Sequence, residues 1–180
     1  MLGIHAFIGD YILKNKSQPI KRKAELLNIN QTERICVLVD LLSIKYHEEL
    51  VQTEKFLKQY VKAVDIITYS NSKMLPEKFT GSKYYFLDNR NLNMFHIPKQ
   101  NSITEFLKKR YDVLLLFNPG QHLPLYYLSA SINSRLKIGE KDHVKSQVIE
   151  FEMNIKKQQL FHFIETVVSY LEKINQTNGL

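Results

Sequence analysis

Four polar residues that could contact a ligand follow two strongly apolar stretches of the chain. Asp40 comes directly after the run ICVLV, and Asn118, Gly120 and His122 come after the run VLLLF. In an open α/β sheet, ligands bind outside the carboxyl ends of the strands. A carboxylate, a carboxamide, an imidazole and a glycine that permits close backbone approach could together hydrogen-bond a polar small molecule. We therefore take these four as the candidate ligand-binding residues.

The segment NPGQHLP, residues 118–124, raises the question of a phosphate-binding turn between a strand and a helix. Pro119 and Pro124 have no backbone N–H to donate to a phosphate. Pro124 fits the first residue of a helix. We expect the segment mainly to turn the chain out of a buried strand. For His122 we favour a turn or capping role over that of a general base.

The sequence carries no recognisable catalytic or metal-binding motif. Its six histidines lack the spacing and the Cys, Asp or Glu partners of a zinc or iron site. The nucleophile-elbow, P-loop and dinucleotide-binding glycine patterns are absent. Asp65 and Asp112 precede predicted strands, so we interpret them as turn residues at the opposite edge and do not pair Asp112 with Asp40. We expect no metal and no cofactor, and we favour a non-catalytic protein without excluding an enzyme.

Positive charge is concentrated near the N-terminus. The net charge is +7, and residues 1–24 contain five cationic residues and one acidic residue. Such a segment can neutralise nucleic-acid phosphates or anionic lipid headgroups, although a solvated arm without a partner fits the composition equally well. The candidate RNA-binding residues are Lys14, Lys16, Lys21, Arg22 and Lys23.

The N-terminal segment also has a helical period. Its apolar stripe consists of Ile4, Phe7, Ile8, Tyr11 and Ile12. This stripe could lie on the protein's own core, on a partner or on a membrane surface, in that order of preference. We divide the chain into a basic amphipathic N-terminal segment, residues 1–32, and a single α/β domain, residues 33–180.

Alternating strand and helix patterns predict the fold. The expected strands are 34–40, 64–70, 83–88 near an edge, 112–118 and 135–139, and the expected helices are 44–62, 102–110, 124–134 and 156–174. A capping box, Ser102 with Glu105, is expected to begin the second of these helices. This alternation implies parallel pairing with helices on both faces. We predict a three-layer, mostly parallel α/β fold, Rossmann-like or flavodoxin-like.

Cysteine content and hydropathy bear on location. The single cysteine, Cys36, excludes an intramolecular disulfide and lies in an apolar run, where we expect a buried, inert thiol. No stretch approaches the ~18 uninterrupted apolar residues of a spanning helix. We therefore expect a cytoplasmic protein.

Residues 112–155 resemble an uncharacterised domain-of-unknown-function family of Bacteroidota. The resemblance rests on YDVLLLFN, LPLYYLSASINSRLKIG and VKSQVIEFEM with a closing amphipathic helix, and it extends over residues 34–174. It implies a fold and no catalytic residues. The same stretch is similar to one half of a heptosyltransferase-like glycosyltransferase, which implies a reduced half domain with a nucleotide-sugar site. The matching positions are Asp112, Arg135, Lys137, Ile138 and Gly139.

Two functional hypotheses follow. The leading one is a non-catalytic protein that docks on RNA or a ribonucleoprotein such as the ribosome through the basic N-terminal segment, by charge and not by base readout. The alternative is nucleotide or nucleotide-sugar binding at the carboxyl ends of the strands. A membrane surface is the least favoured partner, and the sequence leaves the oligomeric state open.

Overall fold

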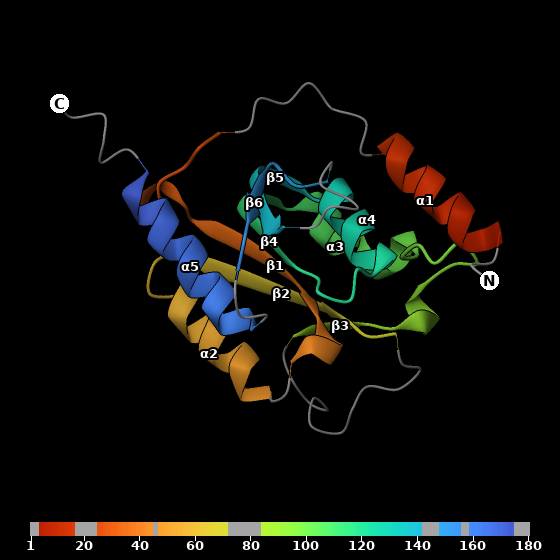
Figure 1. Ribbon diagram of the computed structural model, residues 1–180, viewed down its shortest axis with the longest axis horizontal. Helices are drawn as coiled ribbons and strands as arrows, with labels where there is room; N and C mark the ends of the chain where they lie inside the picture. Colours follow the sequence, from red (N-terminus) through yellow and green to blue (C-terminus); the bar gives the residue numbers. More distant parts are fainter. Residues whose placement is uncertain are drawn as a thin grey trace.

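A computed structural model of the chain describes residues 4–16, 25–44, 47–71, 84–141, 148–155 and 159–174. Six strands of this part form one parallel sheet in the order β3-β2-β1-β4-β5-β6 (Figure 1). They are β1 (Arg34–Asp40), β2 (Ala63–Tyr69), β3 (Tyr85–Leu87), β4 (Arg110–Phe117), β5 (Asn133–Glu140) and β6 (Phe151–Met153). The α-helices are α1 (Ile4–Lys16), α2 (His47–Leu57), α3 (Gln100–Lys108), α4 (Leu123–Ser131) and α5 (Leu160–Lys173).

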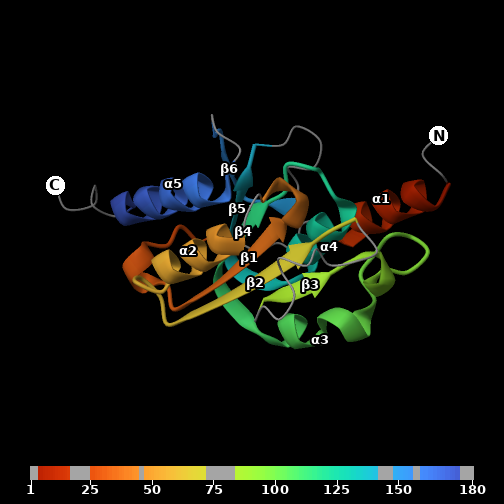
Figure 2. The same ribbon diagram turned by 90° about the horizontal axis from the view of Figure 1, so that it is seen from below.

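The helices cover both faces of the sheet. Helices α2 and α5 lie together on one face, while α3 and α4 cover the other (Figure 2). The predicted three-layer α/β fold is therefore confirmed. The strand order is that of a Rossmann fold and differs from the flavodoxin order. It reverses direction between β1 and β4, which makes that pair of strands the topological switch point.

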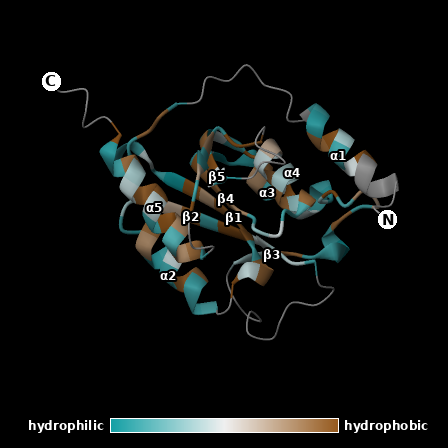
Figure 3. Ribbon diagram, in the orientation of Figure 1, coloured by the Kyte–Doolittle hydropathy of each residue, from teal (hydrophilic) through white to brown (hydrophobic). Residues whose placement is uncertain are grey.

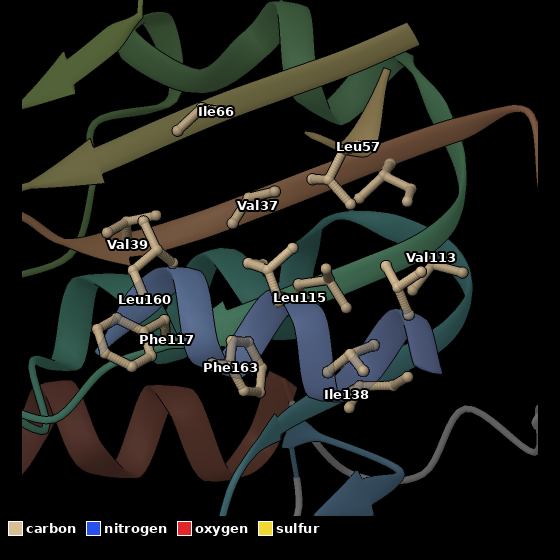
Figure 4. Close-up of a cluster of buried hydrophobic side chains, with 14 of the residues drawn as sticks. Val37, Val39, Leu57, Ile66, Val113, Leu115, Phe117, Ile138, Leu160 and Phe163 are labelled. Atoms are coloured by element: carbon tan, nitrogen blue, oxygen red, sulfur yellow. The ribbon is translucent and has the colours of Figure 1, made fainter. Parts of the chain in front are cut away.

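The continuous apolar runs form strands because both of their faces are buried. In β1, Val37 and Val39 face α2 and α5, whereas Cys36 and Leu38 face α3 and α4. Figure 4 shows the first of these two cores, where side chains of β1, β4 and β5 meet α5. Burial raises the pKa of the Cys36 thiol, with a further contribution from Asp65, and the expected buried thiol is confirmed.

Helix α5 completes the core on the first face. The closing helix is amphipathic, as expected, and its buried stripe consists of Leu160, Phe163, Ile164, Val167, Val168 and Leu171. The ring of Phe163 packs against that of Phe117 on β4, with 5.8 Å between the ring centroids. Helices α2 and α5 alternate hydrophobic and hydrophilic residues, whereas the central strands are largely hydrophobic (Figure 3).

Helix α1 packs on its own chain, against α4. Leu13 is buried in the core shared by α3 and α4. A Cβ atom added at Gly9 would lie 2.4 Å from the backbone oxygen of Phe95, so a glycine is what allows this close approach. The predicted stripe is wrong at Tyr11, which is 63% exposed, because the buried face turns toward Gly9 and Leu13.

Several predicted boundaries are also wrong. The helix expected over 44–62 is shorter, because Ile44 has extended backbone and a turn follows Leu57. The expected capping box of Ser102 and Glu105 does not form, since α3 begins two residues earlier, after Lys99. The backbone N–H of Ser102 donates to the Lys99 oxygen instead.

The helix expected over 124–134 ends at Ser131, because Ile132 is already extended ahead of β5. Asp65 and Asp112 lie inside β2 and β4, and not in the turns before these strands. Their place near the starts of the strands, away from Asp40 at the end of β1, agrees with the sequence prediction. The proposed domain boundary after residue 32 stays a prediction.

Candidate functional site

The structure brings the predicted ligand-binding residues together at the switch point of the sheet. Asp40 is the last residue of β1, and Asn118 directly follows β4. The two strands are neighbours, with Val39 paired to Phe117. Asp40 and Asn118 therefore lie at the same edge, as the sequence predicts for residues that follow adjacent parallel strands.

The Asp40 carboxylate joins two loops. Its Oδ2 atom accepts a hydrogen bond from the backbone N–H of Gly120 over 3.0 Å, and its Oδ1 atom accepts one from Leu42 over 3.0 Å. The side chain is only 4% exposed. A buried carboxylate is stable in such a position because two backbone donors satisfy it.

Asn118 closes the loop that follows β4. Its Oδ1 atom accepts from the backbone N–H of His122 over 2.9 Å, and its Nδ2 atom donates to the His122 carbonyl over 3.1 Å. The backbone N–H of Gln121 donates to the Asn118 carbonyl, and Gln121 adopts a φ of 54°. These three hydrogen bonds join Asn118 to Gln121 and His122 within the loop.

His122 occupies the N-cap position of α4, where its carbonyl oxygen accepts from Leu125. Its Nε2 atom lies 3.5 Å from Oδ1 of Asp40, and its ring meets Tyr69 edge-on with 5.2 Å between centroids. Burial, together with the Asp88 and Asp40 carboxylates, raises the pKa of Tyr69 to about 12. His122 thus lies in the turn at the N-terminus of α4, in agreement with the predicted turn or capping role, but its side chain makes no capping hydrogen bond.

A pocket of about 210 Å³ opens beside this loop, at the carboxyl ends of β4, β5 and β6. Its walls combine apolar side chains with amide, hydroxyl and charged groups. Of the four predicted ligand-binding residues, only Asn118 lines it; Asp40, Gly120 and His122 do not. The lining residues are Leu116, Asn118, Pro119, Gln121, Tyr126, Glu140, Lys141, Ile149, Met153, Asn154 and Ile155.

Glu140 is the most informative of the pocket residues that sequence reasoning missed. It is the last residue of β5 and lies beside Met153 of β6. Burial and the Asp40 carboxylate raise the pKa of Glu140 to about 7. The predicted strand ended at Gly139, one residue too early. A strand that ends at Glu140 would have pointed to this residue, because ligands bind beyond the carboxyl ends of strands.

A separate polar cluster lies near the opposite edge of the sheet. Asp112 accepts from the backbone N–H groups of Glu33 and Arg34 and pairs with Arg135, which also contacts Glu25. Burial pushes the pKa of Asp112 upward, but these hydrogen bonds and the Arg135 charge outweigh it and leave the pKa lowered. Two positions of the glycosyltransferase resemblance, Asp112 and Arg135, thus have structural contacts here.

The basic N-terminal segment is only partly described. Lys14 is exposed on α1, and Lys16 is the last residue of that helix. Lys21, Arg22 and Lys23 lie outside the described residues. Among the residues that the structure describes, no helix could cross a membrane and no group of His, Cys, Asp and Glu side chains could hold a metal ion.

The strand order and the pocket at the strand ends define a parallel α/β protein of Rossmann topology. Residues 5–174 match DUF6913, a family of unknown function, and the chain belongs to that family. A comparison with curated proteins finds no match. The resemblance to an uncharacterised family is confirmed, and the match begins well before residue 34, so it includes the basic N-terminal segment.

Proposed function

We propose that this protein binds a small molecule built on a nucleoside or a sugar ring, the class that includes nucleotides and nucleotide-sugars, in the pocket at the carboxyl ends of β4, β5 and β6. The observation that carries the proposal is the place of the pocket, beside the switch point of a sheet with Rossmann strand order. Ligands of open α/β sheets bind in the crevice at the carboxyl ends of the strands, most often at the switch point, and this pocket lies at that edge, one strand to the side of the switch point. No transfer reaction is part of the proposal.

The lining of the pocket supports a ring-shaped ligand with hydroxyl groups. Leu116, Ile149 and Met153 offer apolar surface for a flat ring. Gln121 and Asn154 carry amides that can both donate and accept, and Glu140 carries a carboxylate that accepts from hydroxyl groups. The wall is more polar than apolar, which favours a ligand rich in hydroxyl groups over a purely apolar one.

Isothermal titration with a panel of nucleosides, nucleotides and sugar nucleotides tests the proposal, with the variant Asn154→Trp as the pocket block. Asn154 is exposed and lines the pocket, so a large ring there fills the space with little effect on the core. Glu152→Trp is the matched control, because Glu152 is exposed on β6 outside the lining. We expect a panel member to bind the unmodified protein and the control but not the block. Binding that survives in Asn154→Trp would contradict the pocket as the site.

A second candidate function rests on charge. We propose that the N-terminal segment also docks on RNA or a ribonucleoprotein, since five cations lie between residues 14 and 23 with no acidic residue among them. Exposed Lys14 on the surface of α1 supports this. A cytoplasmic location, expected from the single cysteine, is part of this proposal.

Fluorescence anisotropy with a labelled single-stranded RNA tests the second candidate. Replacing Lys14, Lys16, Lys21, Arg22 and Lys23 with glutamine should weaken binding and reduce its dependence on salt. A control with the same change in net charge replaces five exposed lysines elsewhere, Lys55, Lys62, Lys99, Lys108 and Lys173. Equal losses in both variants would show that no particular segment binds RNA.

A further inference from the structure

Three backbone N–H groups of the loop beside the pocket already donate hydrogen bonds to other groups of the protein. The N–H groups of Gly120, Gln121 and His122 donate to Asp40 Oδ2, the Asn118 carbonyl and Asn118 Oδ1, respectively. Pro119 and Pro124 in the same stretch have no N–H. A phosphate cradle requires several convergent backbone N–H groups, and this loop does not offer them.

The ends of β1 and β5 carry hydrogen-bond acceptors, the carboxylates of Asp40 and Glu140. Val39 of β1 pairs with Phe117 of β4, and Gly139 of β5 pairs with Leu116, so Asp40 and Glu140 flank β4 at the same edge of the sheet. Each is the last residue of its strand. Burial and, after it, the Asp40 carboxylate raise the pKa of Glu140.

The pocket lining also includes a cation, Lys141, whose charge is screened more strongly than that of Glu140. It is exposed at the end of β5, where water screens its charge. Glu140 is partly buried at the same site. A phosphate group entering the pocket would meet the partly buried Glu140 carboxylate, and like charges in such surroundings repel strongly.

Resting on the proposed function, we propose that the pocket takes an uncharged, hydroxyl-bearing ring, a nucleoside or a free sugar, and discriminates against its phosphorylated form. Glu140 accepts hydrogen bonds from ligand hydroxyl groups. The amides of Asn154 and Gln121 supply the remaining donors and acceptors. The phosphate of a nucleotide would have to stay outside the pocket.

Titration calorimetry at about pH 8, where Glu140 is ionised, tests the discrimination with matched pairs. The probes are adenosine, guanosine, cytidine and uridine with their 5′-monophosphates, and glucose and N-acetylglucosamine with their 1-phosphates. We expect the unphosphorylated member of one pair to bind about tenfold more tightly than its phosphorylated partner.

The variant Glu140→Gln keeps the shape and removes the charge. We expect it to raise affinity for the phosphorylated probe about tenfold while the uncharged probe changes much less. Glu152→Gln is the control, since it makes the same change in net charge at an exposed position on β6. It should leave the ratio of affinities unchanged.

The outcomes separate the two proposals. A phosphorylated probe that binds the unmodified protein as tightly as its partner, or more tightly, would overturn the discrimination and leave the proposed function standing. If the ratio of affinities for the unphosphorylated and phosphorylated probes is the same in Glu140→Gln as in the unmodified protein, Glu140 is not the residue that discriminates between them. If no probe binds, the proposed function fails and the present inference fails with it.

Discussion

The backbone N–H of Gly120 donates a 3.0 Å hydrogen bond to Oδ2 of Asp40, which joins the loop after β4 to the end of β1. This bond lies at the point where the strand order reverses. In a nucleotide-binding Rossmann fold, the backbone donors at the switch point are available to a phosphate. Here the Gly120 N–H donates to the protein's own Asp40 carboxylate, and the ligand site that we propose lies instead toward β5 and β6.

Asp40 is expected to stabilise the fold. Asp40→Ala removes the acceptor of two backbone N–H groups, those of Gly120 and Leu42, in a buried place. Unsatisfied buried donors cost about 1–3 kcal/mol, so we expect a loss of this order in the free energy of unfolding, measured by urea denaturation. Asp40→Asn keeps an oxygen acceptor and should lose less. Equal stability of Asp40→Ala and the unmodified protein would contradict this role.

Gly9 reports on the packing of α1. Alanine favours helices over glycine by about 1 kcal/mol, so Gly9→Ala should stabilise an α1 that stands free of the domain. In the structure the added Cβ atom would meet the Phe95 oxygen at 2.4 Å. Overpacking of this kind costs about 1–3 kcal/mol, and we expect net destabilisation in thermal or chemical unfolding. A stabilised variant would show that α1 does not pack here.

Asp112 should make stability depend on acid pH. Its pKa in the folded protein is lowered below the ordinary value of 3.8. Its contribution is therefore complete above that value and is lost as the pH falls through the lower, folded pKa. Asp112→Asn should show a smaller loss of unfolding free energy between about pH 4 and about pH 2 in urea denaturation. Parallel pH profiles for the two proteins would contradict the assignment.

Glu140 should lower the stability of the fold as the pH rises, whereas Asp112 lowers it as the pH falls. Its pKa is raised from 4.5 to about 7, so the folded state binds its proton more tightly than the unfolded chain. Stability contributed by the protonated form is therefore complete below pH 4.5 and is lost as the pH rises to about 7. Allowing for partial exposure, the loss is about 1–3 kcal/mol.

Glu140→Gln should remove that loss. We expect the variant to be more stable than the unmodified protein at about pH 8, and the difference to shrink at about pH 5. Among the described residues, Asp40 and Lys141 are charged groups near Glu140, and Lys141→Gln serves as a control for the surface charge at this edge. A difference that does not vary with pH would count against a raised pKa.

The fold could be predicted because its signals are local and strong. The run RICVLVD, residues 34–40, is β-branched and apolar throughout, and it forms β1 with the predicted bounds. The amphipathic closing helix was equally predictable, and it forms α5. Helix ends were less predictable: Ser102 and Glu105 have the spacing of a capping box, yet tertiary packing begins α3 two residues earlier.

The site could be predicted only in part. Asp40 and Asn118 were found because residues after neighbouring parallel strands share an edge. The pocket was not found, because its walls come from β6 and from residues that have no motif, such as Ile149 and Asn154. Nor can a sequence show that the Gly120 N–H donates a hydrogen bond to Asp40, since 80 residues separate the two.

Amide chemical-shift mapping tests the central claim most directly. The protein, at 21.2 kDa, is small enough for two-dimensional nitrogen–proton spectra. Titration with the tightest-binding member of the nucleoside and sugar panel should shift the amide signals of Gln121, Glu140, Lys141 and Asn154, and Asn154→Trp should abolish these shifts. Shifts confined to residues away from the ends of β4, β5 and β6, or no shifts with any member of the panel, would contradict ligand binding at this edge of the sheet.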